Sequence, residues 1–89
     1  MNRKERITTL LARELAPIYM DLVDDSAKHA GHSGAQPGGQ THYSLTIKAD
    51  CFSKLNKIQR HQMIYALLAD EFKTGLHALA IDAKTPDEN

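Results

Sequence analysis

The spacing of apolar residues switches along this chain between the period of a helix and the period of a strand, which restricts the possible folds more than any other feature. Between Asn2 and Pro17, apolar residues recur every three or four positions. This spacing predicts a helix that the Asn2 side chain caps. Two later stretches, at about 19–24 and 42–49, alternate apolar and polar residues and therefore predict strands.

The second half of the chain repeats this switch. Residues 50–55 favour one short helical turn, and a row of apolar residues at i, i+4 spacing predicts a longer helix over about 57–73. Asn56 is the expected cap of this helix, and Gly75 is well placed to end it. Alternation returns over 76–84 and predicts a third strand.

These elements predict a single α+β domain over residues 1–89 in the order α-β-β-α-α-β. The first two strands form a hairpin and so run antiparallel, whereas the helical crossover favours a third strand parallel to the second. The sheet is therefore expected to be three-stranded and mixed. Glycine and proline make about 30–41 a flexible loop, and about 86–89 is predicted to be a frayed tail.

Composition restricts the function. Lys and Arg together number 11, as do Asp and Glu, and this zero net charge disfavours a dedicated DNA binder. Cys51 is the only cysteine, which fits a reducing compartment. The charged N-terminal segment is unlike a signal peptide, and no apolar run approaches the ~20 residues that span a bilayer. We therefore expect a cytoplasmic protein that does not enter a membrane.

The predicted topology brings histidines together. The end of the first strand and the starts of the other two share one edge of the sheet, where four of the five histidines can gather: His29, His32, His42 and His77. Neutral imidazole is the commonest metal ligand, so a metal site is one interpretation and solvent-exposed loop histidines are the other. His77 shares parity with Leu79 and is expected to tilt toward the apolar face, where it could instead be a structural histidine. His42 is expected to be exposed or hydrogen-bonded within the hairpin.

Basic side chains gather near the start of the longer helix: Lys54, Lys57, Arg60 and His61. A helix N-terminus with basic neighbours can bind phosphate groups, as nucleic acid would offer. A solvated helix face is the alternative interpretation.

Four segments carry a resemblance to a known family. "LVDDSAKHAGH", "THYSLTI", "IQRHQMIYALLADEF" and "GLHALAIDAKTP" resemble the successive blocks of BolA proteins, and the resemblance extends over about 7–86. The resemblance is specific because the Arg60–His61 pair and "LHALAI" both stand at the matching positions of the family's blocks. The resemblance implies a fold similar to a type II KH domain.

The resemblance implies, first, a role in handling iron–sulfur clusters. BolA-like proteins pair with monothiol glutaredoxins and share a [2Fe–2S] cluster with them. The family's two ligands match His29 and His77 here, with His32 as an alternative loop ligand. The glutaredoxin cysteine and a glutathione thiol would complete the four ligands. Such a protein would be an adaptor and not an enzyme, with apo iron–sulfur proteins as possible recipients.

The resemblance also implies a second function, which is transcriptional regulation through a DNA-binding, helix-turn-helix-like region. That region matches "FSKLNKIQRH" here, with candidate contacts Lys54, Lys57, Arg60 and His61. Its turn reads "SKLN" and lacks the GxxG of an RNA-binding KH domain. Together with zero net charge, this disfavours tight independent binding of nucleic acid.

Overall fold

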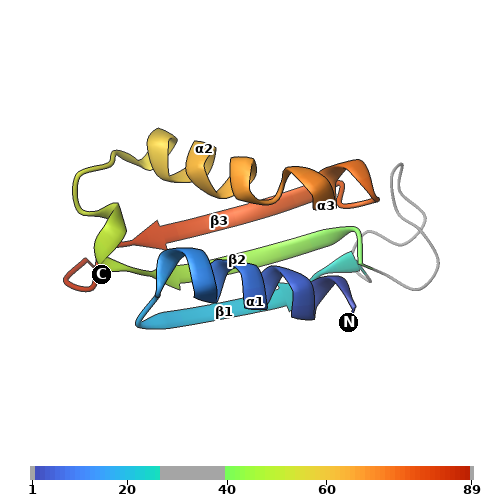
Figure 1. Cartoon of the computed structure of the whole chain (residues 1–89), viewed down its shortest axis with the longest axis horizontal. Coiled ribbons are helices and arrows are strands. Elements are labelled where there is room, and N and C mark those ends of the chain that lie inside the picture. The colour runs from blue at the N-terminus through green and yellow to red at the C-terminus, as the bar shows by residue number, and fades with distance from the viewer. Residues whose placement is uncertain (1, 27–39, 89) are drawn as a thin grey trace.

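The computed structural model describes residues 2–26 and 40–88, which form helices packed on one face of a sheet (Figure 1). The elements follow the predicted order: α1 (Arg3–Leu15), β1 (Tyr19–Asp24), β2 (His42–Lys48), η2 (Asp50–Phe52), α2 (Lys57–Leu67), α3 (Ala69–Lys73) and β3 (Ala78–Lys84). The short η2 is a 3-10 helix. The predicted α+β class with a three-stranded mixed sheet is confirmed.

The sheet has β2 at its centre, between β1 and β3. β2 pairs antiparallel with β1, where Asp24 lies opposite Tyr43, and parallel with β3, where His42 lies opposite Ala78. Both directions are as predicted. The end of β1 and the starts of β2 and β3 therefore share one edge of the sheet, at the right of Figure 1. We call it the histidine edge, after His42 and His77.

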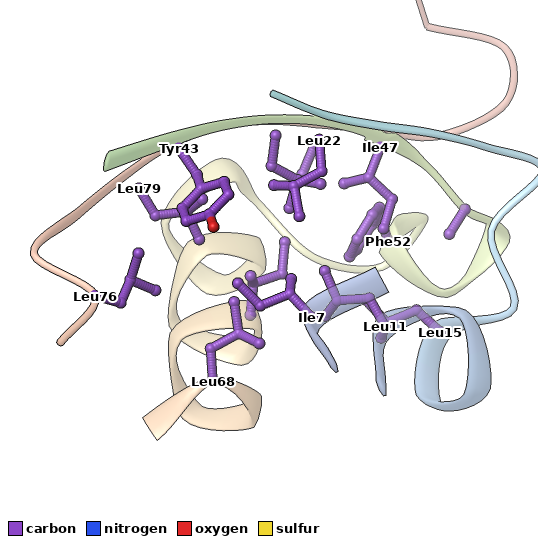
Figure 2. Packing of buried hydrophobic residues seen from close by; sticks show 14 residues of the cluster. Ile7, Leu11, Leu15, Leu22, Tyr43, Ile47, Phe52, Leu68, Leu76 and Leu79 are labelled. Atoms are coloured by element: carbon purple, nitrogen blue, oxygen red, sulfur yellow. The ribbon is translucent and has the colours of Figure 1, made fainter. Parts of the chain in front are cut away.

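The core lies between the helices and one face of the sheet. Along β2, Tyr43 and Ile47 are fully buried and alternate with half-buried polar residues. Figure 2 shows their side chains pointing from the strands toward the helices, with Phe52 of η2 lying among them. The other face is more open, since Tyr19 and Val23 of β1 are both exposed.

The first helix has the predicted cap and the predicted end. The Asn2 Oδ1 accepts a hydrogen bond from the Glu5 N–H at 2.8 Å. Ala16, just after the helix, takes a left-handed φ of 45° before Pro17. The buried side chains of α1 are spaced four residues apart: Arg3, Ile7, Leu11 and Leu15. An arginine therefore begins the buried row of this helix.

The single helix predicted over 57–73 is instead two helices, α2 and α3, that meet at Leu68. The predicted cap is present, since the Asn56 and Gln59 side chains each accept a hydrogen bond from the other's backbone N–H. The break falls at Leu68, whose φ of −99° and ψ of 15° depart from those of a helix. Phe72 stays partly buried against the core.

The C-terminal segment differs from the frayed tail that was expected, because residues 86–88 form a turn. The Thr85 N–H donates to Glu88 Oε1 at 2.9 Å, and Arg60 Nη1 lies 2.8 Å from the same oxygen. The charged sequence "DEN" suggests solvent exposure when taken alone. Its partner Arg60 is far away along the chain, so sequence spacing could not reveal the pairing.

This turn predicts one pH dependence of stability. Hydrogen bonds from the Thr85 N–H and hydroxyl, joined by Arg60, lower the pKa of Glu88 from 4.5 to about 2. A depressed folded-state pKa contributes stability above pH 4.5, and that contribution is lost as the pH falls toward about 2. We expect Glu88→Gln to lower the thermal unfolding midpoint near neutral pH, with the difference from wild type shrinking through this acid window. A difference that stays constant through the window would contradict this assignment.

Candidate metal-binding site at the histidine edge

His77 presents an exposed imidazole whose orientation is set by backbone groups. Its N–H donates to the Thr41 carbonyl at 2.7 Å, and its ring Nδ1 lies 2.9 Å from the Gly75 carbonyl oxygen. A carbonyl oxygen only accepts, so Nδ1 carries the proton in this hydrogen bond, and the neutral ring keeps its lone pair on Nε2. Metal-binding histidines usually show this arrangement, with the other ring N–H donated to a carbonyl or carboxylate.

The prediction that His77 tilts toward the apolar face is wrong. β3 begins one residue later, at Ala78, and Gly75 takes a φ of +131°, which turns the chain before the strand. Leu76 is the side chain that enters the core there. Alternation of the two faces holds within a strand but does not extend across the turn that precedes it.

His42, the first residue of β2, lies beside His77. The two rings stack with centroids 6.2 Å apart and an angle of 19° between their planes. The His42 Nδ1 lies 2.9 Å from the Thr41 Oγ1, so a hydrogen bond within the hairpin region is confirmed. The stacking of His42 on His77 was not predicted from the sequence. It arises because the parallel register places His42 opposite Ala78, next to His77.

Two side chains at and just after the end of β1, Asp24 and Ser26, bind the backbone at the start of β2. The Ser26 Oγ accepts hydrogen bonds from the N–H groups of Thr41 and His42, at 3.0 and 3.1 Å. The Asp24 carboxylate accepts from the N–H groups of Ser26 and Gln40, at 2.8 and 3.1 Å. Burial raises the pKa of Asp24, but hydrogen bonding to the side chain and backbone of Ser26 and to the backbone of Gln40 outweighs it and leaves the pKa below its usual value. Residues 26 and 40 are therefore held at the histidine edge.

His29 and His32, the two predicted loop ligands, lie outside the described residues, as does most of the predicted flexible loop. Thr41, at the end of that predicted loop, is instead fully buried. Its carbonyl accepts from the N–H groups of His77 and Ala78, at 2.7 and 3.1 Å, and so begins the pairing of β2 with β3.

The described part of the histidine edge offers two imidazoles. Within residues 2–26 and 40–88, no group of three or more His, Cys, Asp or Glu side chains is placed to hold a metal ion. Cys51 lies beyond the other end of β2, and burial raises the pKa of its thiol, which favours the protonated form. Any thiolate ligand at the histidine edge would therefore have to come from another molecule.

The second candidate site keeps three of its four predicted members on the surface: Lys54, Lys57 and His61. Arg60 is buried, which corrects its assignment to nucleic-acid binding. Its Nε donates to the Leu55 carbonyl at 3.0 Å and its Nη1 to the Ala83 carbonyl at 2.9 Å. Its guanidinium carbon also lies 5.9 Å from the centre of the Phe52 ring. Arg60 therefore joins α2 to β3 and the core, and does not face a phosphate.

The fold and the site define a class of protein. It is a small α+β domain with helices on one face of a mixed sheet and an exposed histidine at the edge of that sheet. Residues 11–88 match the family model described as BolA-like protein. The solved structure of BolA1 from Arabidopsis thaliana superposes with a TM-score of 0.89 at 40% identity, covering 100% of this chain and 97% of that one. The chain belongs to the BolA-like protein family.

Three curated relatives illustrate the range of this family. SufE-like protein 1 of Arabidopsis thaliana is 45% identical over 98% of this chain and 24% of its own length. BOLA1 of the same plant is 40% identical over 99% of this chain and 56% of its own length. The Escherichia coli protein named DNA-binding transcriptional regulator BolA is 33% identical over 96% of this chain and 77% of its own length. The chain thus spans about a quarter and about half of the two plant relatives.

The names of relatives bear on location. The two plant proteins are named chloroplastic/mitochondrial and chloroplastic. None of the helices in residues 2–26 and 40–88 is long and apolar enough to cross a membrane. The predicted cytoplasmic location of this chain stays a prediction.

Proposed function

We propose that this chain is an adaptor that shares a [2Fe–2S] cluster with a monothiol glutaredoxin, and that it regulates or delivers clusters without catalysing a reaction. The observation that carries the proposal is the His77 ring. It is exposed, its Nδ1–H is committed to the Gly75 carbonyl, and its Nε2 keeps the lone pair. This is the state in which a neutral histidine binds a metal.

The ligand count supports a shared cluster. A [2Fe–2S] cluster takes four ligands. Of the two imidazoles that the described residues place at the histidine edge, we assign only His77 as a ligand. His29 is our proposed second ligand and His32 the alternative. His29 follows Ser26 by three residues, and a chain of three residues spans at most about 11 Å. The glutaredoxin cysteine and a glutathione thiol would supply the rest. When bound, such a cluster would carry one electron, at a potential that imidazole ligation raises.

Anaerobic reconstitution tests this proposal. The chain is mixed with a monothiol glutaredoxin, glutathione, ferric iron and sulfide, and followed by size-exclusion chromatography and visible circular dichroism. We expect one heterodimer with a spectrum different from that of the glutaredoxin alone. His61→Ala is the matched control for His77→Ala. His61 is exposed near the start of α2, and α2 begins at the end of the molecule opposite the histidine edge (Figure 1). If the wild-type chain elutes separately and leaves the glutaredoxin spectrum unchanged, the proposal fails.

DNA binding is the second candidate function. It is supported by the name of the Escherichia coli relative and by the exposed side chains of Lys54, Lys57 and His61 around the start of α2. Burial of Arg60 reduces the cations available to phosphate groups. With zero net charge, this leaves DNA binding the weaker candidate.

If DNA is bound through this surface, Lys54→Ala combined with Lys57→Ala should weaken binding about equally for all sequences. Each lost phosphate contact should reduce the slope of log K against log salt by about 0.9, so about 2 for the pair. Fluorescence anisotropy over a salt series measures this slope. Lys4→Ala combined with Lys73→Ala, at exposed positions of α1 and α3, is the control with the same change of charge. An equal effect of this control pair, or no binding at low salt, would exclude this surface.

A further inference from the structure

Arg3, the first residue of α1, binds the two backbone segments that lead to His42 and His77. Its Nη1 donates to the Gln40 carbonyl, and its backbone N–H donates to Gln40 Oε1 at 3.1 Å. Its Nη2 donates to the Thr74 carbonyl at 2.8 Å. Gln40 stands two residues before His42, and Thr74 stands three residues before His77. One guanidinium thus holds two segments that are far apart in the sequence.

The residues next to these two carbonyls set the position of His77. Thr41, which follows Gln40, accepts the His77 N–H at 2.7 Å. Gly75, which follows Thr74, accepts the ring Nδ1–H at 2.9 Å. A shift of either segment would therefore move the backbone of His77 or the acceptor that holds its ring.

Glu71 of α3 holds the Arg3 guanidinium in place. Its Oε1 accepts from Arg3 Nε at 2.9 Å, and its two oxygens accept from Arg6 at 2.8 and 2.9 Å. The hydrogen bond from Arg6, together with that from Arg3, keeps the pKa of Glu71 below its usual value. Gly75 packs closely against Arg3, since an added Cβ there would lie 3.2 Å from Nη2. The guanidinium is therefore enclosed on several sides.

Only arginine can make this set of contacts. Its rigid, planar fork presents several N–H donors at once, whereas lysine presents a single compact ammonium group on a flexible stem. Lysine at position 3 would keep the charge near Glu71 but could not also hold both the Gln40 and the Thr74 carbonyls.

We propose that Arg3 is a positioning residue for the histidine edge. It acts through the Gln40 and Thr74 carbonyls to hold His77 in the orientation that binds metal. The functional part rests on the proposed role of His77 as a cluster ligand, while the structural part concerns the isolated chain and stands by itself.

The test compares Arg3→Lys with Arg60→Lys. Arg60 is the matched control because it is also a buried arginine that donates to two backbone carbonyls. One of them belongs to Ala83, near the end of β3 that is opposite the histidine edge. One measurement is the ¹H–¹⁵N NMR signature of the His77 ring in the isolated chain, which reports the Nδ1–H hydrogen bond. The other is the rate at which the reconstituted heterodimer loses its cluster to a chelator.

We expect both variants to lower the unfolding midpoint, but only Arg3→Lys to change the His77 ring signals and to speed cluster loss by about tenfold. If both variants leave the His77 signals unchanged, the positioning role is overturned, whether or not a cluster forms. If wild type forms no cluster but Arg3→Lys alone alters the ring signals, the proposed function fails and the positioning role stands. Should Arg3→Lys not fold, Glu71→Gln replaces it, since it keeps the fork and removes its anionic partner.

Discussion

Replacing His77 with alanine should abolish the visible circular dichroism of the heterodimer's cluster. The ring is exposed, oriented by the Gly75 carbonyl and placed with its Nε2 lone pair available to a metal. Removing a ligand should reduce the affinity for the cluster by more than the 10- to 100-fold that is usual when only a hydrogen-bond partner of a ligand is removed. Because the side chain is exposed, the free energy of unfolding should change by less than about 0.5 kcal/mol. Spectra of the reconstituted complex and urea unfolding of the isolated chain measure the two quantities.

Two further variants show whether the loss is specific to His77. His61→Ala should keep the wild-type spectrum, since His61 lies near the start of α2 and not at the histidine edge. His42→Ala should have an intermediate effect, because it removes the ring stacked on His77. A wild-type spectrum and a wild-type rate of cluster loss in His77→Ala would show that His77 is not a ligand.

Among alanine substitutions of the four predicted nucleic-acid contacts, Arg60→Ala should be the most destabilising. It should lower the free energy of unfolding by about 3 kcal/mol. It leaves the carbonyls of Leu55 and Ala83 without their donor, and each unsatisfied buried group costs roughly 1–3 kcal/mol. It also uncovers the ring of Phe52. Against a total stability of roughly 5–15 kcal/mol for a domain, this is a large fraction. Urea unfolding followed by far-ultraviolet circular dichroism measures it.

The comparison with Lys57→Ala separates a structural arginine from a phosphate-binding one. Lys57 is exposed at the start of the same helix, so its removal should change stability by no more than about 0.5 kcal/mol. Equal stabilities of Arg60→Ala and Lys57→Ala would contradict the burial argument. Any loss of DNA binding in Arg60→Ala should be interpreted only where the variant is still folded.

The arrangement of elements could be predicted because apolar periodicity and capping residues are local signals. β1 occupies the predicted Tyr19–Asp24, and the Asn56–Gln59 cap is present. The parallel pairing of β2 with β3 followed from the helical crossover alone. What periodicity missed is the break at Leu68, whose backbone angles depart from those of a helix without glycine or proline to mark the position.

The two buried arginines were missed because arginine is usually assigned to solvent. A signal was nevertheless present in the spacing. Arg3 stands four residues before Ile7 and Arg60 four residues before Ile64, so each begins the buried row of its helix. A long aliphatic stem can follow the apolar face while its guanidinium reaches backbone carbonyls beyond it.

Topology predicted that His42 and His77 share one edge of the sheet, but it did not predict their local geometry. His77 was assigned to a strand face, whereas it lies before the strand and outside the core. Its stacking with His42 depends on the register of two parallel strands, which no local pattern contains. The contacts of Arg3 with Gln40 and Thr74 join segments far apart in the sequence, so they could not be predicted from spacing.

Pulsed electron paramagnetic resonance of the reduced heterodimer tests most directly whether this chain supplies histidine ligands. The chain is labelled with ¹⁵N-histidine and the glutaredoxin is left unlabelled, so any ¹⁵N coupling to the cluster must come from this chain. We predict couplings from two histidine nitrogens in wild type, and from at most one in His77→Ala. A reduced cluster that shows no ¹⁵N-histidine coupling in the wild-type complex would contradict the account.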